Sequence, residues 1–394
     1  MDLTKEKTSK NITVLPFPVY FWMVALLTVA GFADSVYLAI SHYRVYTDIA
    51  YSSFCAISKA INCDTVSQSL YSIFLGLPVP VWGIFGYVFF LLFLPLAKNE
   101  DAAKKRTWAI LFLVATGFSV YSVILAIISS FIIHSYCIMC IISYAISFLL
   151  LFYTQMIRNR FNCEPIVSGL KLDIRFLVAK RAYCFCVFGP FYLAIILVKI
   201  FLPAYWNMSQ PTLSPQISTG ITADGHPWIG AQNPKLVITE YTDYQCFQCK
   251  KMHYFIRQLI SRHPEKIRLV HRHFPMDHEF NPIVKEPFHV GSGKMALLAI
   301  STVPKSKFWQ MNDILFDRAG KKGALNIKEL ADEVGIAYPY LGRSIIDPAI
   351  RIQLQRDIRS GLKLNIDGTP AFVINNKVHL AQIPAEIIKE AVKD

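Results

Sequence analysis

Residues 236–249, with the sequence LVITEYTDYQCFQC, join a β-rich run to a Cys-x-x-Cys motif. The run at residues 236–241 predicts a strand, and residues 246–261 predict a helix. Cys246 therefore lies at or near a helix N-terminus, where unsatisfied amides and the helix dipole favour a thiolate and lower its pKa. Cys249, one turn later, is placed to resolve a mixed disulfide. This arrangement indicates a redox-active dithiol.

Two other interpretations of the motif remain. Cys246 and Cys249 could form a structural disulfide, or they could be half of a zinc site. A zinc site needs two more ligands at suitable spacing, and His253 would supply only one of them. The agreement of strand, motif and helix favours the redox interpretation.

The surrounding pattern predicts an α/β domain over residues 233–394. A second strand is expected at residues 266–274, and Asn375-Asn376 predicts a two-residue turn between two further strands. Residues 207–232 are rich in Ser, Thr, Pro and Gly, which predicts a linker. The strands beside the turn cover residues 371–374 and 377–380, and helices are expected at residues 293–302, 307–318, 326–334, 348–364 and 384–392.

The N-terminal half has the composition of a membrane protein. The chain is 54% hydrophobic and 17% charged, with a mean hydropathy of +0.38, whereas soluble domains are about 25% charged. These values exclude a disordered or wholly soluble protein. Five apolar runs are each near or above the roughly 20 residues that a spanning helix needs. They cover residues 18–43, 78–97, 107–133, 137–157 and 183–206.

The basic residues predict the orientation of these spans. Thirteen Lys and Arg residues lie in the N-terminal tail and in the second-to-third and fourth-to-fifth connections, whereas the alternate connections hold Arg44 and Lys59. This asymmetry predicts a cytoplasmic N-terminus and an external C-terminal domain. The net charge of +13 is thereby divided among loops without a basic block, which argues against nucleic-acid binding.

The chain has nine cysteines, so they cannot all be paired with one another. Cys137 and Cys140 open the fourth span at its outer end, and Cys55 and Cys63 lie in the outer loop after the first span. These two pairs therefore share the external face with the Cys246 motif. Alternatively, these four cysteines could form a single zinc site. The three remaining cysteines are interpreted as small hydrophobic residues toward the cytoplasm: Cys163, Cys184 and Cys186.

The C-terminal part resembles the thioredoxin superfamily, and within it the DsbA-like proteins with a helical insertion. The resemblance rests on the strand before Cys246-Phe247-Gln248-Cys249, the second strand, the helices, and Gly368-Thr369-Pro370. It implies that Pro370 is the cis-proline beside Cys246 and that the backbone of Thr369 binds an extended substrate peptide.

The first 160 residues resemble the vitamin K epoxide reductase family. The matching residues are Cys55, Cys63-Asp64-Thr65-Val66, Ser69, Ser72-Ile73-Phe74-Leu75-Gly76 and Cys137-x-x-Cys140-x-x-x-Tyr144. The resemblance implies a four-helix bundle around a quinone, closed by the loop with the first cysteine pair. It implies that Cys140 faces the quinone and that Cys137 exchanges with the loop cysteines. Tyr144 and Ser69 are the expected quinone-pocket residues, and Tyr71 stands where vertebrate members have asparagine.

Three other features of the sequence are site candidates. Asp34 lies within the first span, where an intramembrane carboxylate suggests function, although a solvated structural role is equally compatible. His271 and His273 share one strand face and could be metal ligands. Two histidines on such a strand are more often hydrogen-bonded or exposed without a metal. Ser67 and Ser69 could bond the backbone of a short helix or a redox sulfur.

The sequence thus predicts a membrane bundle at residues 1–160, a cytoplasmic loop and fifth span at 161–206, a linker at 207–232 and a periplasmic thioredoxin-like domain at 233–394. The expected protein is a multi-pass inner-membrane enzyme that generates disulfides in exported cysteine-containing clients. Electrons would pass from Cys246/Cys249 through Cys55/Cys63 to Cys137/Cys140, and then to ubiquinone or menaquinone, without a metal. The alternatives are an outward relay of reductant and a membrane-anchored binding or chaperone module.

Overall fold

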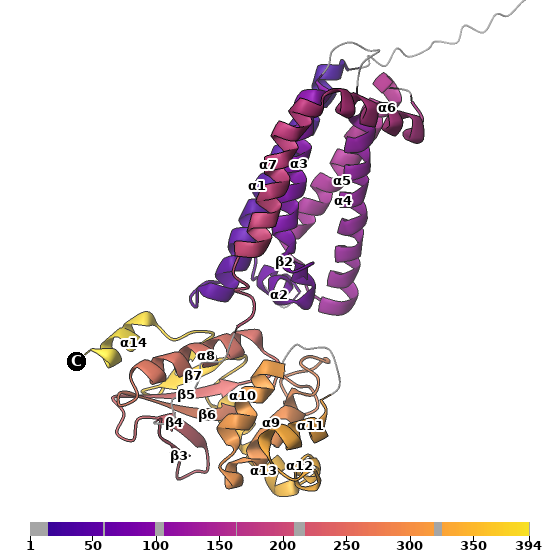
Figure 1. The fold of residues 1–394 in the computed structure, drawn as a ribbon. Helices are drawn as coiled ribbons and strands as arrows, with labels where there is room; N and C mark the ends of the chain where they lie inside the picture. Colours follow the sequence, from indigo (N-terminus) through magenta and orange to yellow (C-terminus); the bar gives the residue numbers. More distant parts are fainter. Residues whose placement is uncertain are drawn as a thin grey trace, which may run out of the picture. The chain divides into compact units, whose positions relative to one another are not determined.

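The computed structural model describes residues 15–57, 60–98, 106–162, 164–208, 217–318 and 325–393. The chain divides into two compact units, which are described separately below (Figure 1). The helical unit comprises the described residues up to Val45 together with Ser52–Ala204. The α/β unit comprises Tyr46–Tyr51 and the described residues from Tyr205 onward.

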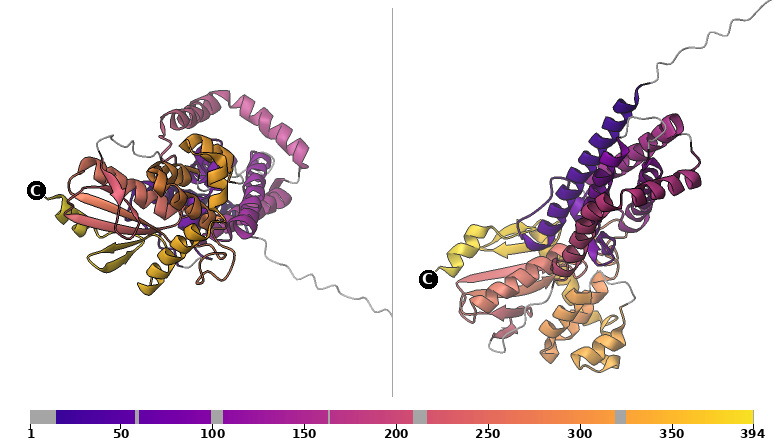
Figure 2. Two further views of the ribbon diagram at one scale, coloured as in Figure 1. Left: turned by 90° about the horizontal axis from the view of Figure 1, so that it is seen from below. Right: turned by 45° about the horizontal axis from the view of Figure 1, so that its top comes forward.

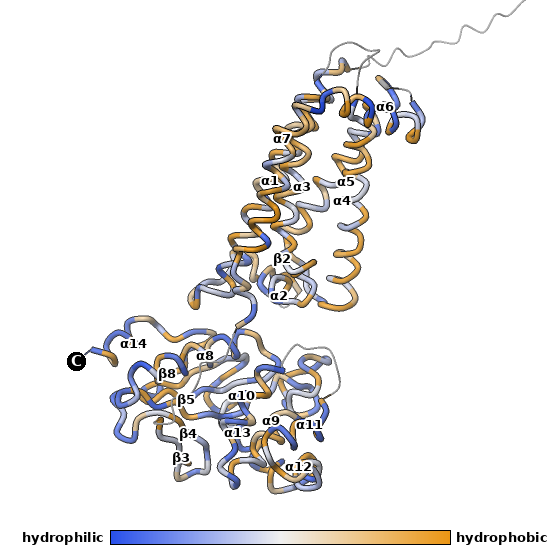
Figure 3. The backbone as a smooth tube through the Cα atoms, viewed as in Figure 1, coloured by the Kyte–Doolittle hydropathy of each residue, from blue (hydrophilic) through white to orange (hydrophobic). Residues whose placement is uncertain are grey.

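Five helices of the helical unit are long and apolar enough to cross a membrane, as predicted. They are drawn mostly in the hydrophobic colour in Figure 3. Two π-helical turns, Ser129–Ile133 (η3) and Arg158–Asn162 (η4), extend α4 and α5. The five helices are α1 (Phe17–Thr47), α3 (Val79–Ala97), α4 (Trp108–Ile128), α5 (Ile138–Ile157) and α7 (Arg181–Phe201).

The core of the helical unit is built mainly from α1, α3, α4 and α5. Its buried side chains include Phe21, Phe90, Trp108 and Leu150. None of the residues of α7 is buried, which suits a helix that faces lipid. α1 and α3 approach closely at Gly31, where an added Cβ would lie 2.3 Å from the ring of Tyr87.

Short elements connect the long helices. Between α1 and α3 lie α2 (Cys63–Gln68), the 3₁₀ turn η1 (Leu70–Ser72), and a hairpin of β1 (Ile73–Phe74) and β2 (Leu77–Pro78). Before α7, residues predicted as loop form α6 (Ile166–Ala179). The buried carboxylate of Asp173 on α6 accepts hydrogen bonds from the backbone amides of Thr107, Ala109 and Ile110, at 2.7–3.3 Å. Asp173 therefore satisfies amides at the start of α4 that would otherwise lack acceptors.

The α/β unit contains a six-stranded sheet in the order β3-β4-β6-β5-β7-β8. β5 pairs in parallel with β6 and antiparallel with β7, so the sheet is mixed. Asn375 and Asn376 have φ values of 48° and 60° in the turn from β7 to β8, which is the left-handed backbone of the predicted hairpin. The strands are β3 (Thr219–Ile221), β4 (Pro227–Gly230), β5 (Leu236–Thr242), β6 (Ile267–His273), β7 (Ala371–Ile374) and β8 (Lys377–Leu380).

Helices surround this sheet. α8 (Phe247–Arg262) follows β5 directly. The helices inserted between β6 and β7 contact one another and gather into one cluster beside the strands in both views of Figure 2. Five helices form this cluster, and α14 (Ala385–Val392) closes the described chain. The five are α9 (Ser292–Ser301), α10 (Phe308–Arg318), α11 (Ile327–Val334), α12 (Tyr338–Ser344) and α13 (Pro348–Lys363).

Three elements of the α/β unit differ from the sequence-based expectation. The predicted linker at residues 207–232 is wrong over residues 219–230, because β3 and β4 form there. β3 pairs with β4, and β4 pairs with β6, so both strands belong to the sheet. Three- and four-residue strands with Gly and Pro carry too short an alternation to be told from a loop. α12 was not predicted either, since its seven residues include a proline and a glycine.

Candidate functional site

The outer-loop cysteines of the helical unit form a disulfide. Cys55 and Cys63 are bonded, with 5.7 Å between their Cα atoms, and both are buried. Asn62 caps α2 by accepting hydrogen bonds from the amides of Asp64 and Thr65, so that Cys63 becomes the first helical residue. A site of four zinc-bound thiolates is incompatible with this disulfide.

The second pair lies against the first. Cys55, Cys63 and Cys137 form one buried cluster, and Cys140 packs against it. Cys137 and Cys140 are free thiols. The sulfur of Cys137 caps α5 by accepting a hydrogen bond from the amide of Cys140 at 3.2 Å. The structure therefore brings together two cysteine pairs that lie more than seventy residues apart.

Backbone pairing holds the two segments in register. The amide of Asn62 donates to the carbonyl of Tyr136 at 2.9 Å, and the amide of Tyr136 donates to the carbonyl of Ala60 at 2.8 Å. These bonds form a parallel bridge between Ile61 and Tyr136. Because Ile61 and Tyr136 immediately precede Asn62-Cys63 and Cys137, the bridge aligns the two cysteine segments.

A cavity of about 290 Å³ opens beside Cys140 in the helical unit. Its wall takes residues from α1 to α5, the four long helices of the core among them, and none from α7. The lining combines aromatic and aliphatic side chains with several hydroxyl groups. The expected pocket residues Tyr144 and Ser69 both lie in this wall, as do Tyr71 and Ser67. The Ser69 hydroxyl donates to the carbonyl of Val66, which is the backbone-bonding role considered for the serines.

Some cavity residues were not predicted. His42 on α1 lies in the wall, with its Nε2 3.3 Å from the Ser72 hydroxyl oxygen. Trp82 also lines it and donates its Nε1–H to the carbonyl of Phe74 at 2.8 Å. A helical sequence shows which residues share a face, but several faces of these helices are equally apolar. The sequence therefore carried no signal for the inward face.

The third pair opens α8 of the α/β unit. The sulfur of Cys246 caps this helix by accepting a hydrogen bond from the amide of Cys249 at 3.2 Å. The Thr369–Pro370 peptide bond is cis, and the Cys246 thiol donates to the carbonyl of Thr369 at 3.5 Å. The structure thus brings together all four residues proposed for this site from the sequence.

The two thiols of this pair have opposite pKa shifts. Burial raises the pKa of Cys246, but the hydrogen bond from Cys249 and the charge of His289 outweigh it, so the net pKa lies below the ordinary thiol value. The pKa of Cys249 is raised well above that value by burial and then by its hydrogen bond to Cys246 and the charge there. Cys246 is therefore the nucleophile that this geometry favours.

His289 is a residue that the sequence did not reveal. Its Nδ1 lies 3.0 Å from Oδ2 of the buried Asp243, which also accepts a hydrogen bond from Ser292. The side chain of Gln245 donates to the carbonyl of Val290 at 2.7 Å. These bonds tie the His289 segment to the residues just before Cys246, across more than forty residues of chain.

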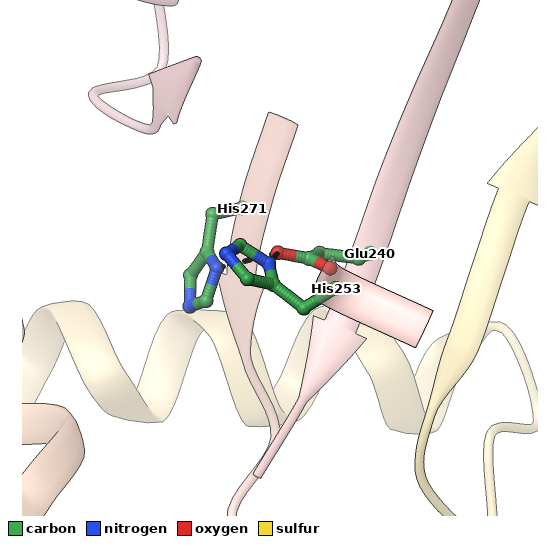
Figure 4. A group of neighbouring side chains, drawn as sticks. All are labelled: Glu240, His253 and His271. Atoms are coloured by element: carbon green, nitrogen blue, oxygen red, sulfur yellow. Dashed lines mark hydrogen bonds and ion pairs between the residues drawn. The ribbon is translucent and has the colours of Figure 1, made fainter. Parts of the chain in front are cut away.

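A second polar cluster lies buried between β5, β6 and α8. Figure 4 shows both imidazoles directed at the Glu240 carboxylate. Glu240 Oε1 lies 2.9 Å from His253 Nδ1 and 2.7 Å from His271 Nδ1. One ligand atom from each residue lies within 4.8 Å of the others, so the group could hold a metal ion. The imidazoles have further partners, however: Asn312 lies 3.0 Å from His253 Nε2, and His273 lies 3.3 Å from His271 Nε2. Hydrogen bonding thus accounts for the cluster, and it joins His271 and His273 in one network.

The remaining cysteines lie apart from these sites. Cys184 donates from its thiol to the carbonyl of Leu177 at 3.5 Å, and Cys186 is exposed on α7. Cys163 lies outside the described residues. Neither of the two described thiols belongs to the buried cysteine cluster or to the cavity wall.

Taken together, the described residues contain five membrane-length helices with two cysteine pairs beside a cavity, and an α/β domain with a Cys-x-x-Cys motif beside a cis-proline. The comparisons with known families agree. Residues 22–155 match the model of the vitamin K epoxide reductase family, and residues 222–394 match a thioredoxin model. The chain therefore contains a domain of the vitamin K epoxide reductase family at residues 22–155, followed by a thioredoxin-like domain at residues 222–394.

Individual proteins match parts of the chain. The Na⁺/H⁺ antiporter NhaA 1 of Salinispora arenicola is 21% identical over 165 residues, which are 41% of this chain and 24% of that protein. The chain thus spans about a quarter of the length of this curated relative. A thioredoxin-like oxidoreductase from Silicibacter pomeroyi is 24% identical over 43% of this chain and 91% of its own, with a TM-score of 0.35. BdbD from Bacillus subtilis is 20% identical over 45% of this chain and 98% of its own, with a TM-score of 0.36.

Proposed function

We propose that this protein is a quinone-dependent disulfide-generating enzyme of the plasma membrane. The observation that carries the proposal is the buried contact among Cys55, Cys63 and Cys137, with Cys140 reaching the cavity wall. Thiolate attack on a disulfide requires sulfurs that can meet. Two pairs in van der Waals contact beside a cavity meet that requirement.

The relay follows from the chemistry of each pair. The disulfide form of Cys246/Cys249 accepts two electrons and two protons from a client dithiol, which becomes a disulfide. The reduced pair then passes them to the Cys55–Cys63 disulfide, and Cys55/Cys63 pass them to Cys137/Cys140. At each step one disulfide breaks and another forms, so electrons and protons balance.

The cavity suits a flat apolar ring with polar oxygens. Its wall is largely apolar, and it places the Cys140 segment and the hydroxyls of Tyr144 and Ser72 around one space. A quinone bound there would supply the two-electron acceptor. Cys140 would face it, and Tyr144, one helical turn later, would hold a carbonyl oxygen.

The proposed orientation places the thioredoxin-like domain in the periplasm. It rests on the thirteen basic residues in the N-terminal tail and alternate connections, against Arg44 and Lys59 in the others. On that side the relay can act on exported proteins. The described cysteines toward the opposite face are Cys184 and Cys186, which lie two residues apart on α7 and so do not face each other. This arrangement disfavours a relay fed by a cytoplasmic reductant.

A mixed-disulfide trap tests the relay. In the full-length protein, Cys249→Ser is combined with Cys55→Ser or with Cys63→Ser, and non-reducing digestion with mass spectrometry identifies the linked peptides. With added quinone as the two-electron oxidant, acting through Cys137/Cys140, one double variant should accumulate a bond between Cys246 and the remaining loop cysteine. Cys249→Ser with Cys184→Ser is the matched control, because its loop disulfide keeps both cysteines and can resolve the bond. Absence of the crosslink in both loop variants would refute the relay.

A further inference from the structure

We infer that Asp34, acting through the Ser143 hydroxyl, carries a proton between the Cys140 thiol and the cavity. This inference rests on the proposed function, because it assigns a residue to the last step of that relay. Oxidation of the Cys137/Cys140 dithiol releases two protons, and reduction of a quinone to a quinol consumes two. A protein that performs this exchange away from water needs a group that can hold a proton in transit.

Asp34 is the one acidic residue in the five described membrane-length helices. Its side chain is buried, with 6% of the residue exposed. An ionisable group inside a membrane bundle is costly unless it is paired or serves a function. Among the described residues no basic side chain pairs with it, so its cost is not offset by a salt bridge.

The contacts of Asp34 point to the cysteine site. The Ser143 hydroxyl donates a hydrogen bond to Asp34 Oδ2. Ser143 lies three residues after Cys140 on α5, and therefore on the same face of the helix. Both residues line the cavity. The Ser143 hydroxyl can accept one proton while it donates another, so it can connect the carboxyl group to the cavity.

The second carboxyl oxygen of Asp34 is free of hydrogen bonds from the described residues. This atom, Oδ1, is also buried. A carboxylate held only for structure would bond both oxygens. An unpartnered oxygen is instead available to bind a proton. The titratable groups that interact electrostatically with Asp34 are Tyr87 on α3 and Cys137 and Cys140 at the start of α5.

The proton balance is simple. The Asp34 carboxylate takes the proton from the Cys140 thiol, and the resulting carboxyl group releases it through Ser143 Oγ toward the cavity. The carboxylate is restored in each turnover. Asp34 thus carries one of the two protons, and the Cys137 thiol supplies the other. The electron pair passes from the cysteine sulfurs to the quinone, so Asp34 itself is neither oxidised nor reduced.

Asp34→Asn tests this role in the purified full-length protein. We expect the kcat for anaerobic quinone reduction to fall about 100-fold, the lower end of the usual range for loss of a general acid or base. The KM for quinone should be unchanged, and Asp34→Glu should recover part of the rate. Thr28→Val is the matched control: Thr28 is also buried on α1, bonds the carbonyl of Val24 in its own helix, and should retain the full rate.

A second readout does not depend on quinone. In quinone-free reduced protein, the rate of Cys140 alkylation is measured against pH in a Cys137→Ala background. Removal of the nearby carboxylate should move the midpoint of this profile to lower pH in Asp34→Asn, and Thr28→Val should leave it in place. If Asp34→Asn does not fold, Ser143→Ala provides the same tests and should lower kcat at unchanged KM.

The outcomes separate this inference from the proposed function. Wild-type kcat and an unshifted alkylation profile in Asp34→Asn would overturn the role of Asp34 while leaving the relay in place. A rise in KM with unchanged kcat would overturn it as well, because it would make Asp34 a residue that shapes the cavity. If the wild-type protein cannot reduce a quinone, the proposed function itself fails.

Discussion

The thiol of Cys246 donates a hydrogen bond to the carbonyl oxygen of Thr369, a residue 123 positions later in the chain, at a distance of 3.5 Å. Thr369 immediately precedes β7. The Cys246 sulfur therefore lies beside the backbone of Thr369, and we propose that an extended client peptide binds there by main-chain hydrogen bonds. Under the proposed function, a client cysteine would meet Cys246 at this place.

The first prediction concerns the order of reaction within this pair. Cys246 retains 8% exposure and a lowered pKa, whereas Cys249 is fully buried with a raised pKa. A Cys249→Ser variant should therefore accumulate mixed disulfides with client proteins at Cys246. Cys246→Ser should accumulate none, as non-reducing electrophoresis would reveal. Equal trapping by both variants would contradict the assignment of Cys246 as the nucleophile.

The second prediction concerns His289. Its positive charge favours the Cys246 thiolate, so His289→Gln should raise the pKa of Cys246. Alkylation of Cys246 near neutral pH should then slow by roughly threefold to tenfold. His263→Gln, at the far end of α8, is the matched control. An alkylation profile in His289→Gln that superimposes on that of the control would remove His289 from the site.

Acid should destabilise the thioredoxin-like domain. Burial lowers the pKa of His271, and lowers that of His273 to well below its usual range. The unfolded chain therefore binds more protons below about pH 6.5, and each histidine removes about 1.4 kcal/mol of stability per pH unit as the pH falls. Burial also lowers the pKa of His226, but bonding to Asp357 more than reverses this, so His226 offsets part of the loss.

Glu240 acts in the same direction at lower pH. Burial raises its pKa, but the charge of His253 and the hydrogen bonds of both histidines lower it to about 2. Its contribution is present above about pH 4.5 and is lost as the pH falls toward about 2. Protection factors of β5 and β6 amides from hydrogen exchange in the full-length protein, measured from about pH 7 down to about pH 2, would check both trends. Protection that increases with acid would contradict them.

Removal of the Glu240 charge should be costly at neutral pH. Glu240→Gln removes the buried charge that lies against two imidazoles and replaces one carboxylate oxygen by a donor amide group. Breaking such a buried network costs about 3–5 kcal/mol. Glu265→Gln, an exposed residue, should change stability by less than about 0.5 kcal/mol. Denaturant unfolding of both variants provides the comparison. Equal stability would mean that the cluster contributes little to the fold.

Asp173 offers a test of the helical unit. Asp173→Ala leaves three amides at the start of α4 without their acceptor, which should lower stability by about 1–3 kcal/mol. Lys171→Ala, on the exposed side of the same helix, should be nearly neutral. Thermal unfolding in detergent would distinguish them. Similar midpoints for both variants would show that α6 does not support α4.

Much of the fold could be predicted because its signals are local. Five long apolar runs and a strand followed by Cys-x-x-Cys each depend on residues that are neighbours in sequence. β3 and β4 were missed because short strands gain their identity only by pairing with β6. The same reason hid His289 and Asp243, which meet through a hydrogen bond across 46 residues.

The helical site shows a similar limit. The cysteines and Tyr144 stand out by residue type and spacing, whereas the partner of Asp34 could not be predicted. Asp34 and Ser143 are 109 residues apart, and their contact depends on how α1 packs on α5. Likewise, the inward faces of the apolar helices become distinct only after the bundle has formed around the cavity.

Anaerobic quinone reduction by a dithiol in the purified full-length protein tests the central claim most directly. The wild-type protein should reduce a quinone at the expense of the dithiol, and Cys140→Ala should lose this turnover. Cys186→Ala, a change at an exposed thiol of α7, should retain it. Unimpaired turnover in Cys140→Ala would contradict the relay from the cysteine cluster to a quinone.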